Sequence, residues 1–488
     1  MSNPEDDPRL ARAPALRSPA SVRWSDARPV DAVPPAPSAM VQVGGRRDPP
    51  PSSSGPRRPV ADPAAVSRAA TPAFHPREPS SWAEVGFDAS VAEQLVLRTL
   101  LELHVASGSA LSRATALPAP LVKEVVDALK NSKLVVHRGT STFGDFQSEL
   151  SEAGQARAID LRKGTTYVGP APVPWDQYLA SVQAQALAHR HPTPDDLANA
   201  FSDLLVSDEL LMRLGPAVTS GRPMFLHGDP GNGKTSLAER MTRCFGDAIW
   251  VPYTLLLGGQ LVKLFDPAVH ERVEVDPSGE RFDRRWVRVK RPTVITGGEL
   301  TLQMLEFELD PRSKLCEAPI QLKANCGTLV IDDFGRGNLS PRDLLNRWIV
   351  PLEKRVDFLR LPDGRKEQVP FECLLVFSTN LEPKDLADEA FLRRIPYKIQ
   401  VVDPLEDEFM RLVESTARAM GIGLAPHAVR YLVDRHYKRS KRPFRFCHPR
   451  DLLLQVQHLC MFEGRAPVAG PAEWDLVASN YFTLMSVE

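Results

Sequence analysis

The stretch over residues 224–241 restricts the fold of this chain more than any other. Its first residues, MFL, form an apolar run that is typical of a buried parallel strand. The run leads into residues 228–235, GDPGNGKT, which match the pattern G-x-x-x-x-G-K-[ST] at every fixed position. A helical pattern follows over residues 236–244. Because strand, glycine-rich loop and helix come in this order, the stretch predicts a phosphate-binding loop in an α/β fold with a parallel sheet.

The residues of this loop suit a phosphate ligand. Its glycines can adopt backbone conformations that are closed to other residues, so that backbone N–H groups approach the phosphates. The following helix adds a partial positive charge at its N-terminus. We expect Lys234 to reach the β- and γ-phosphates and the Thr235 hydroxyl to bind Mg²⁺. The residues predicted to bind the nucleotide here are Gly228, Asp229, Pro230, Gly231, Asn232, Gly233, Lys234, Thr235 and Ser236.

Two later apolar runs end in polar residues that suit the same site. Residues 327–333, GTLVIDD, predict a buried strand that ends in Asp332 and Asp333, and residues 373–380, CLLVFSTN, predict another that ends in Asn380. Asp332 is predicted to hold the magnesium shell, which makes it the second metal-binding residue beside Thr235. Asp333 is expected to polarise the attacking water, and Asn380 is expected to lie beside the γ-phosphate.

Length and composition limit the class of protein to which this chain can belong. A chain of 488 residues predicts about three domains, and 43% hydrophobic residues are enough to bury their cores. The net charge of −1 gives no global argument for nucleic-acid binding, although a local patch is left open. No apolar run is long enough to span a membrane, and the N-terminus lacks the pattern of a signal peptide. The six cysteines never form C-x-x-C, which favours buried thiols, no metal framework and a cytoplasmic location.

The N-terminal third divides into two parts. Residues 1–80 hold seventeen of the 45 prolines and almost no periodic apolar pattern, so a disordered tail is predicted. Over residues 82–163, helical patterns at 89–107, 109–116 and 118–132 are followed by two short strands around a Gly/Ser/Thr turn and by a last helix. Three helices and a hairpin resemble a winged helix-turn-helix domain. Its third helix offers only Lys123 and Lys130 as strong phosphate partners, so protein contacts are favoured over DNA binding.

A linker with one helix is expected over residues 164–194, and the α/β nucleotide-binding domain over 195–402. Residues 248–252 are predicted to form the second strand of its sheet, followed by a long insertion over 253–325. Within the insertion, residues 270–275 and 284–289 predict a hairpin with a basic strand. That strand is interpreted as a solvated face, a substrate-contacting loop or a nucleic-acid contact, and these alternatives stay open. A second hairpin is predicted over residues 356–371. Helical patterns over residues 403–488 predict an all-α lid.

This succession resembles the AAA+ ATPases, from about residue 195 to the end of the chain. Five motifs occur in the family's order. GDPGNGKT (228–235) resembles Walker A, LVIDD (329–333) Walker B, STN (378–380) sensor 1, FLRRI (391–395) the arginine-finger segment and HPRD (448–451) sensor 2. The hairpin just before sensor 1 resembles that of the pre-sensor-1 insertion clade, which includes MoxR-like chaperones.

The resemblance implies ATP and Mg²⁺ as cofactors and a homo-oligomeric ring, often a hexamer, with ATP between subunits. Arg393 or Arg394 would then reach the neighbour's γ-phosphate, and Arg450 the subunit's own. Two departures stand out. The usual catalytic Glu is Asp333 here, whose carboxylate is one methylene further back. The stretch YTLLLGG at residues 253–259 occupies the expected place of a pore loop but does not match its pattern.

These motifs support an ATP-hydrolysing remodelling ATPase of the chaperone type, acting on a protein client through the winged-helix-like domain. One alternative is a DNA-associated AAA+ ATPase that uses this domain and the basic hairpin. Another is a scaffold that binds ATP but hydrolyses it slowly. The client itself cannot be predicted from the sequence.

Overall fold

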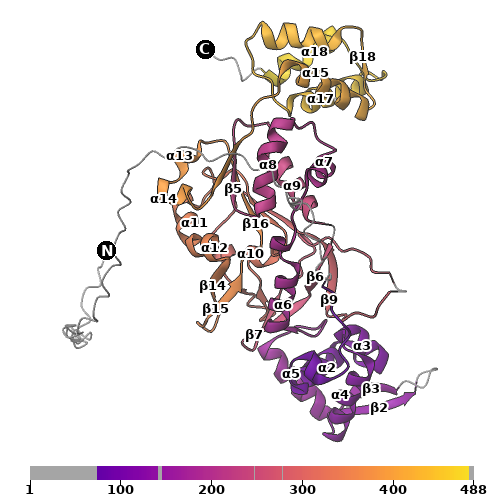
Figure 1. Cartoon of the computed structure of the whole chain (residues 1–488). Coiled ribbons are helices and arrows are strands. Elements are labelled where there is room, and N and C mark those ends of the chain that lie inside the picture. Colours follow the sequence, from indigo (N-terminus) through magenta and orange to yellow (C-terminus); the bar gives the residue numbers. More distant parts are fainter. Residues whose placement is uncertain (1–73, 141–145, 247, 277–278, 483–488) are drawn as a thin grey trace, which may run out of the picture. The chain divides into compact units, whose positions relative to one another are not determined.

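The computed structural model describes residues 74–482 except 141–145, 247 and 277–278. Within them, a five-stranded parallel sheet carries the central α/β fold (Figure 1). Its order is β10 (Thr293–Thr296), β13 (Thr328–Ile331), β16 (Leu374–Thr379), β5 (Met224–His227) and β17 (Tyr397–Gln400). Strands β5, β13 and β16 are buried along their whole length, because elements cover both faces of the sheet. The predicted α/β fold class with a parallel sheet is confirmed.

The second strand of this sheet is not the predicted one. Residues 248–252 form β6 (Ala248–Pro252), but β6 pairs antiparallel with β9 (Trp286–Lys290) in a separate two-stranded sheet. The edge of the parallel sheet is β10, which pairs with β13. Both runs are short, apolar and β-branched, so their patterns alone do not decide which one joins the sheet. β10, the second strand of the parallel sheet along the chain, therefore lies within the insertion, and parts of the insertion come before and after it.

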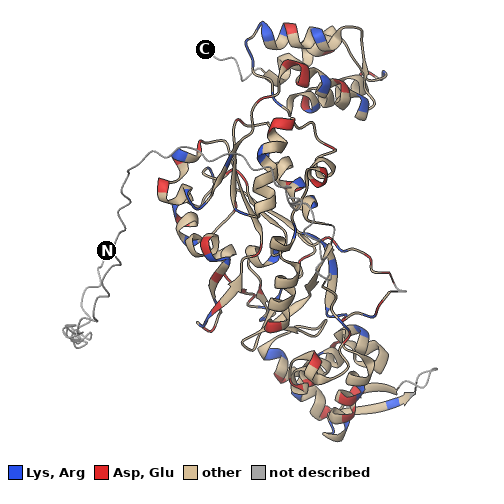
Figure 2. Cartoon of the chain, viewed as in Figure 1, with Lys and Arg blue, Asp and Glu red and all other residues tan. Residues whose placement is uncertain are grey.

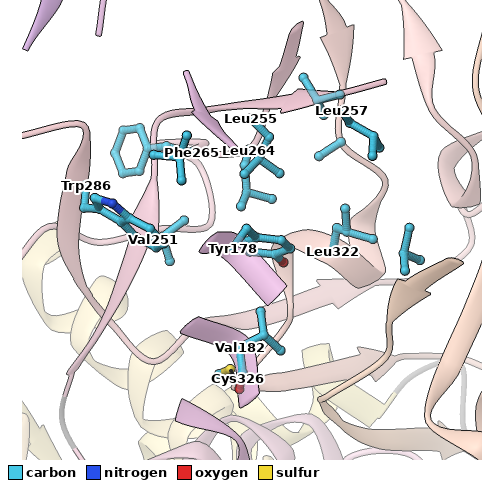
Figure 3. Close-up of a cluster of buried hydrophobic side chains, with 14 of the residues drawn as sticks. Tyr178, Val182, Val251, Leu255, Leu257, Leu264, Phe265, Trp286, Leu322 and Cys326 are labelled. Carbon is cyan, nitrogen blue, oxygen red and sulfur yellow. Dashed lines mark hydrogen bonds between the residues drawn. The ribbon is translucent and has the colours of Figure 1, made fainter. Parts of the chain in front are cut away.

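Four short strands of the insertion and β4 form a second five-stranded sheet. Its order is β11 (Glu308–Leu309), β12 (Cys316–Glu317), β8 (Gln260–Lys263), β7 (Thr254–Leu257) and β4 (Val173–Pro174). The YTLLLGG stretch supplies β7 and its turn, and Leu255 and Leu257 are buried in the apolar cluster of Figure 3. Tyr178 and Val182 of α6 (Trp175–Gln185) enter the same cluster. Most of β7 is buried, whereas Gly258 and Gly259 in the turn that follows it are exposed.

The predicted basic hairpin also differs. One bridge, Arg272 to Val289, joins its two halves, and β9 pairs mainly with β6. Part of the predicted turn lies outside the described residues. Arg285 is 1% exposed and donates to Asp283 and to two backbone carbonyls, while buried Arg291 donates to the carbonyls of Gln185 and Cys326. These two arginines stabilise the junction of β9 with its surroundings, whereas Arg284 and Lys290 are exposed.

The N-terminal described part contains helices and a three-stranded antiparallel sheet of order β1-β3-β2. Side chains of Asp88, Ser107 and Ser151 cap α2, α3 and α5 by accepting hydrogen bonds from backbone N–H groups. The turn predicted between β2 and β3 lies largely outside the described residues. The elements are α1 (Trp82–Val85), α2 (Ala89–Leu103), β1 (Val105–Ser107), α3 (Gly108–Thr115), α4 (Ala119–Asn131), β2 (Val135–Thr140), β3 (Phe146–Leu150) and α5 (Glu152–Gly164).

Residues 74–80 lie inside the boundary expected for the tail, yet they are packed. The Phe74 ring lies 5.4 Å from that of Trp286, and His75 lies edge-on to Trp250 at 5.6 Å. The Pro76 carbonyl accepts a hydrogen bond from the Asp283 backbone N–H at 2.9 Å. The remainder of the predicted tail, residues 1–73, lies outside the described residues.

Short helices complete the described chain. Between α6 and β5 lie η2 (Leu187–His189), α7 (Pro194–Ala200) and α8 (Asp208–Ser220), and the phosphate-binding loop is followed by α9 (Lys234–Met241) and η3 (Thr242–Phe245). Six short helical segments flank the later strands: η4 (Gln303–Leu305), α10 (Ile320–Lys323), α11 (Pro341–Arg347), α12 (Ile349–Lys354), α13 (Pro383–Leu386) and α14 (Glu389–Leu392). The predicted hairpin is formed by β14 (Val356–Arg360) and β15 (Lys366–Pro370).

The C-terminal part is helical, as predicted, apart from one pair of two-residue strands, β18 (Gly423–Leu424) and β19 (Val468–Ala469). Its helices share an apolar cluster that buries Phe409, Tyr437 and Trp474. They are α15 (Glu406–Ala419), α16 (Ala428–Leu432), the π-helix η5 (Val433–Lys438), α17 (His448–Phe462) and α18 (Pro471–Phe482). Among the helices of the described residues, none is both long and apolar enough to cross a membrane.

Candidate nucleotide-binding site

A cavity of about 840 Å³ opens at the carboxyl ends of the parallel strands. In open α/β sheets this edge is where ligands bind. Residues 230–236 of the phosphate-binding loop and its helix line the cavity together with Asp332, Asp333, Asn380 and Arg450. Tertiary structure thus brings together residues from four of the five predicted motif segments, all but the arginine-finger segment. Further lining comes from residues 203–210, which precede and open α8, and from α15.

The phosphate-binding loop has the backbone that its glycines predict. Gly228, Gly231 and Gly233 all have positive φ angles, at 138°, 83° and 76°. At Gly228 a Cβ atom would lie 2.3 Å from the Val401 carbonyl oxygen, so only glycine fits between the loop and β17. Gly233 is the N-cap of α9, which places the N-terminus of that helix at the cavity.

Lys234 lies at the centre of the site. Its Nζ donates hydrogen bonds to the carbonyls of Gly228 and Asp229, both at 2.9 Å, and to Asn380 Oδ1 at 2.5 Å. The side chain is largely buried, and burial lowers its pKa, while the charges of Asp332, Asp333 and Asp229 act in the opposite direction. Lys234 therefore joins the loop to the strand that ends in Asn380, although 146 residues separate the two.

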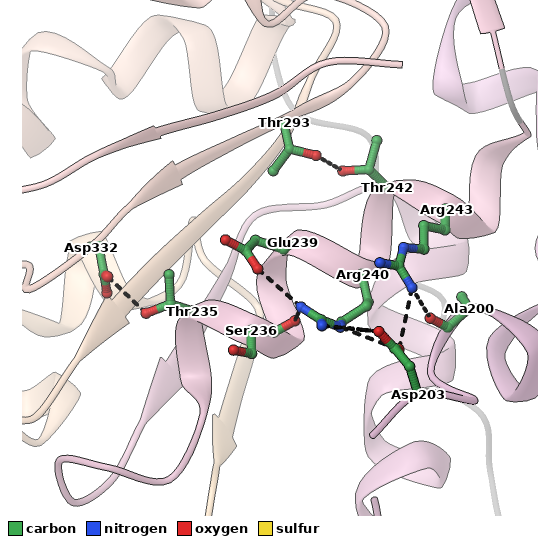
Figure 4. A network of polar contacts seen from close by, with 10 residues as sticks. All are labelled: Ala200, Asp203, Thr235, Ser236, Glu239, Arg240, Thr242, Arg243, Thr293 and Asp332. Atoms are coloured by element: carbon green, nitrogen blue, oxygen red, sulfur yellow. Dashed lines mark hydrogen bonds and ion pairs between the residues drawn. The ribbon is translucent and has the colours of Figure 1, made fainter. Parts of the chain in front are cut away.

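The two predicted metal-binding residues are in direct contact. The Thr235 hydroxyl donates to Asp332 Oδ2 at 2.7 Å, as Figure 4 shows. Asp332 directly follows β13, and its backbone N–H donates to the Thr296 carbonyl on β10 at 2.7 Å. A hydroxyl and a carboxylate supply hard oxygen ligands, which is the donor set that Mg²⁺ prefers. The chemistry of this pair fits Mg²⁺ held jointly with phosphate oxygens. Among the described residues, no cluster of three or more His, Cys, Asp or Glu forms a metal site by itself.

Asp333 and Asn380 are also neighbours. Asn380 Nδ2 donates to Asp333 Oδ1 at 3.3 Å. Asp333 adopts a φ of 48°, a conformation that costs energy for residues other than glycine and that concentrates at functional sites. The next residue is anchored on both sides, because the Phe334 backbone N–H donates to the Ser378 carbonyl and its carbonyl accepts from the Thr379 hydroxyl. This anchoring holds the Asp333 carboxylate at the cavity.

Helix α9 is tied to the segment that lines the cavity before α8. Asp203 accepts from Arg240 Nη2 at 3.0 Å and from Arg243 Nη1 at 3.2 Å (Figure 4). Thr242, the first residue of η3, shares a hydrogen bond with Thr293 on β10 at 2.7 Å. These contacts set the distance between the phosphate-binding loop and the wall formed by residues 203–207.

The two arginines of the FLRRI segment differ from each other, and within the described residues neither lines this cavity. Arg394 is held in place, since its Nε donates to Glu353 Oε1 at 2.6 Å and its Nη1 to the Ala390 carbonyl at 3.0 Å. The Arg393 side chain is exposed and makes no hydrogen bond or ion pair with the described residues. Of these two arginines, contacts within the described residues hold Arg394 and leave the Arg393 side chain exposed.

Sequence reasoning missed one arginine. Arg445, in the segment before α17, donates from Nη1 to Asp229 Oδ2 of the phosphate-binding loop at 2.8 Å and to the Asp403 carboxylate. No local pattern points to this residue, because its partner in the loop is 216 residues away.

Comparisons with known proteins add two findings. A family model described as a domain of unknown function (DUF8689) matches residues 405–480. Similar solved structures include a point mutant of Thermotoga maritima RuvB, 13% identical over 62% of this chain and 75% of that chain, with a TM-score of 0.33. The Thermotoga maritima RuvB Holliday junction branch migration motor is 14% identical over 63% and 76% of the two chains, with a TM-score of 0.31. With similarity this low, the P-loop fold is assigned from the strand order and loop of this chain.

Proposed function

We propose that this chain is an AAA+ ATPase that binds ATP with Mg²⁺ and hydrolyses it to ADP and phosphate. One observation carries the proposal: Lys234 Nζ bonds the loop carbonyls and Asn380, while Thr235 contacts Asp332, all at the carboxyl edge of the parallel sheet. A phosphate-binding loop, an acid pair and a polar amide around one cavity are the groups that phosphoryl transfer requires. The cavity volume lies within the range of small-ligand sites.

The roles follow from the side chains. Bound Mg²⁺ and ATP supply a Lewis acid and a transferable phosphoryl group. With nucleotide bound, Lys234 would bond phosphate oxygens in place of the loop carbonyls, and Thr235 with Asp332 would hold the metal. Asp333 orients the attacking water and accepts its proton, and Asn380 orients Asp333 through the hydrogen bond between them. Arg450 contacts the phosphates from the helical side of the cavity.

The proposal includes a homo-oligomeric ring, with a hexamer favoured. An exposed Arg393 outside its own cavity supports a finger that acts on the neighbouring subunit. The hairpin β14–β15, which immediately precedes β16, supports the pre-sensor-1 insertion clade and its MoxR-like, chaperone-type members. The proposed domains are a linker over residues 164–194, the nucleotide-binding domain over residues 195–402 and the lid over residues 403–488.

A protein client is favoured over DNA. The order of helices and strands over residues 82–163 supports a winged-helix-like domain that recruits the client. The exposed face of its third main helix, α4, is electrically balanced, because Lys123 and Lys130 alternate with Glu124 and Asp127. Acidic as well as basic residues occur on this part of the chain (Figure 2). DNA binding would need a basic face. All six cysteines are free thiols, which supports a reducing, cytoplasmic location.

Steady-state phosphate release with Mg²⁺ and ATP tests the proposal. The parent protein is expected to release phosphate, and Lys234→Ala is expected to lose ATP binding while its thermal unfolding stays cooperative. Arg418→Ala is a control that is expected to keep ATP binding, because Arg418 also carries a positive charge but is exposed on α15 and does not line the cavity. Unchanged nucleotide affinity in Lys234→Ala contradicts the assignment. Binding without release in the parent favours the slow scaffold.

A further inference from the structure

A single arginine within the helical part of the chain joins the phosphate-binding loop to the segment that precedes this part. Arg445 belongs to the segment that leads into α17, Asp403 to the segment between β17 and α15, and Asp229 to the loop itself. Nη1 of Arg445 donates to Asp229 Oδ2 at 2.8 Å and also to Asp403 Oδ1. The Arg445 side chain is 15% exposed. Charge-assisted hydrogen bonds in a partly buried place are the strong ones.

Two further contacts connect the same three segments. Asn232 Nδ2 of the loop donates to Asp403 Oδ1 at 2.6 Å. The Cys447 backbone N–H donates to the Gly231 carbonyl at 2.9 Å. The fit is close, since a Cβ atom at Gly231 would lie 2.6 Å from Cys447 Sγ. The phosphate-binding loop is therefore held over residues 229–232, by Asp403 and Cys447, which line the cavity, and by Arg445.

Arg445 itself is not among the cavity-lining residues, whereas Arg450 is. Its positive charge nevertheless acts on the site, because it adds to the burial that lowers the pKa of Lys234. The cavity of about 840 Å³ exists while all these contacts are made. The closed contact therefore leaves room for a ligand, so it prepares the loop for binding and does not block it. Preorganisation of this kind raises affinity without touching the ligand.

We infer that Arg445 is a positioning residue, which latches the phosphate-binding loop to the helical part through Asp229 and Asp403 and thereby sets the affinity for nucleotide. The inference rests on the proposed ATPase function and deepens it. Loss of the latch leaves a loop that must be ordered on binding, so KM rises. The groups around Asp333 stay in place, so kcat is maintained.

Isothermal titration with ADP and Mg²⁺ tests the latch in the full-length chain. Arg445→Ala and Asp229→Asn are each expected to weaken affinity about tenfold, within the usual span of coupling between sites. The double variant is expected to bind no more weakly than the weaker single variant, because each change breaks the same contact. In phosphate release, Arg445→Ala is expected to raise KM about tenfold with kcat within about twofold, a split that simple loss of folded protein would not give.

Two controls separate the latch from a general loss of charge. Arg418→Ala removes an exposed positive charge from α15 and is expected to leave affinity unchanged. Arg450→Ala combined with Asp229→Asn is expected to give additive effects, since no hydrogen bond or ion pair joins Arg450 to the loop within the described residues. If Arg445→Ala fails to fold, Arg445→Lys serves in its place. Lysine keeps the charge but lacks the planar guanidinium whose Nη1 donates to both carboxylates, and a smaller loss of affinity is expected.

Parental affinity in Arg445→Ala, or strict additivity between Arg445→Ala and Asp229→Asn, overturns the latch while leaving the ATPase proposal intact. Absence of ADP binding by the parent protein instead overturns the proposed function, and the latch falls with it. An equal loss of kcat and of affinity in Arg445→Ala assigns the residue to the chemistry and likewise overturns a positioning role.

Discussion

At the scale of single residues, Asp333 is the most unusual group in the site. It stands where the resemblance leads one to expect Glu, and its φ of 48° lies in the left-handed region. Asp and Asn tolerate this region better than longer side chains do, because their short polar groups bond locally. The Asp333 carboxylate is held in addition by Asn380 Nδ2 at 3.3 Å, from 47 residues away. The backbone conformation thus offers a physical reason for the shorter acid.

Substitution of Asp333 tests its role. Asp333→Asn should keep ATP affinity and lose about 10²–10⁴-fold in turnover, because an amide cannot accept the proton. Asp333→Glu should also be slower than the parent, since Glu at positive φ costs roughly 1–2 kcal/mol and displaces the carboxylate from Asn380. Steady-state phosphate release at saturating ATP measures both. Full activity in Asp333→Asn would remove Asp333 from the mechanism, and faster turnover in Asp333→Glu would show that the short acid limits the parent.

At the scale of elements, α17 combines a structural histidine with the residues that face the cavity. His448 opens this helix, is 4% exposed and shares a hydrogen bond between Nδ1 and the Tyr437 hydroxyl at 3.1 Å. Phe482 of α18 lies edge-on to its ring at 5.4 Å. Burial is the main cause that lowers the pKa of His448 to about 4 from its usual value of 6.5. The packing of three helical elements therefore depends on a neutral imidazole.

A pH dependence of stability follows. Between the two pKa values the unfolded chain binds a proton that the folded chain does not, so the contribution of His448 is complete above about pH 6.5 and is lost as the pH falls toward about 4. The full loss amounts to roughly 3 kcal/mol. Urea unfolding at pH 7 and pH 5 should show a smaller pH effect in His448→Gln than in the parent. His458→Gln, at an exposed position of the same helix, is the control, and equal pH effects in all three proteins would contradict the role of His448.

At the scale of the whole molecule, residues 74–80 pack against segments that are far from them in the sequence. Residues 74–80 add to the edge of the insertion, where Phe74 packs on Trp286 and Arg77 forms a bridge with Phe282. Glu78 also pairs with Arg281. This short segment covers aromatic side chains that belong to a sheet some 200 residues later in the chain.

Truncation measures what the segment contributes. Removal of residues 1–80 is expected to lower the free energy of unfolding by roughly 1–2 kcal/mol, because the partly buried Phe74 ring leaves the cluster. Removal of residues 1–73 is the matched control, since it leaves every described contact in place. Thermal unfolding of the two truncated proteins is the measurement. Equal Tm values would mean that the packing of residues 74–80 adds nothing to stability.

Assembly can be tested by complementation. Arg393→Ala and Lys234→Ala should each abolish most ATPase activity, whereas a mixture of the two proteins should regain part of it, because a mixed ring pairs an intact loop with an intact finger. Arg394→Ala should keep most activity, as Arg394 is occupied by Glu353 and the Ala390 carbonyl. Phosphate release of the mixtures is the readout. A mixture that stays inactive would indicate that Arg393 acts within its own subunit or only in folding.

The sequence by itself determined the local features of this protein. The strand–loop–helix unit around Lys234, the strands that end in Asp332 and Asn380, the hairpin β14–β15 and the C-terminal helices all follow from short patterns. Such patterns are sufficient because backbone conformation and the alternation of apolar residues are set over a few neighbouring positions. The α/β class follows as well, since buried strands that alternate with helices favour a parallel sheet.

Tertiary structure alone decided how these pieces meet. β6 and β10 are both apolar runs, and only their packing determines that β10 pairs with β13 while β6 pairs with β9. The difference between a held Arg394 and an exposed Arg393 depends on Glu353 of α12. The contact of Arg445 with Asp229 spans 216 residues. Pairings of this kind are chosen by burial and charge across the folded molecule, where residues far apart in sequence become neighbours, so no local pattern encodes them.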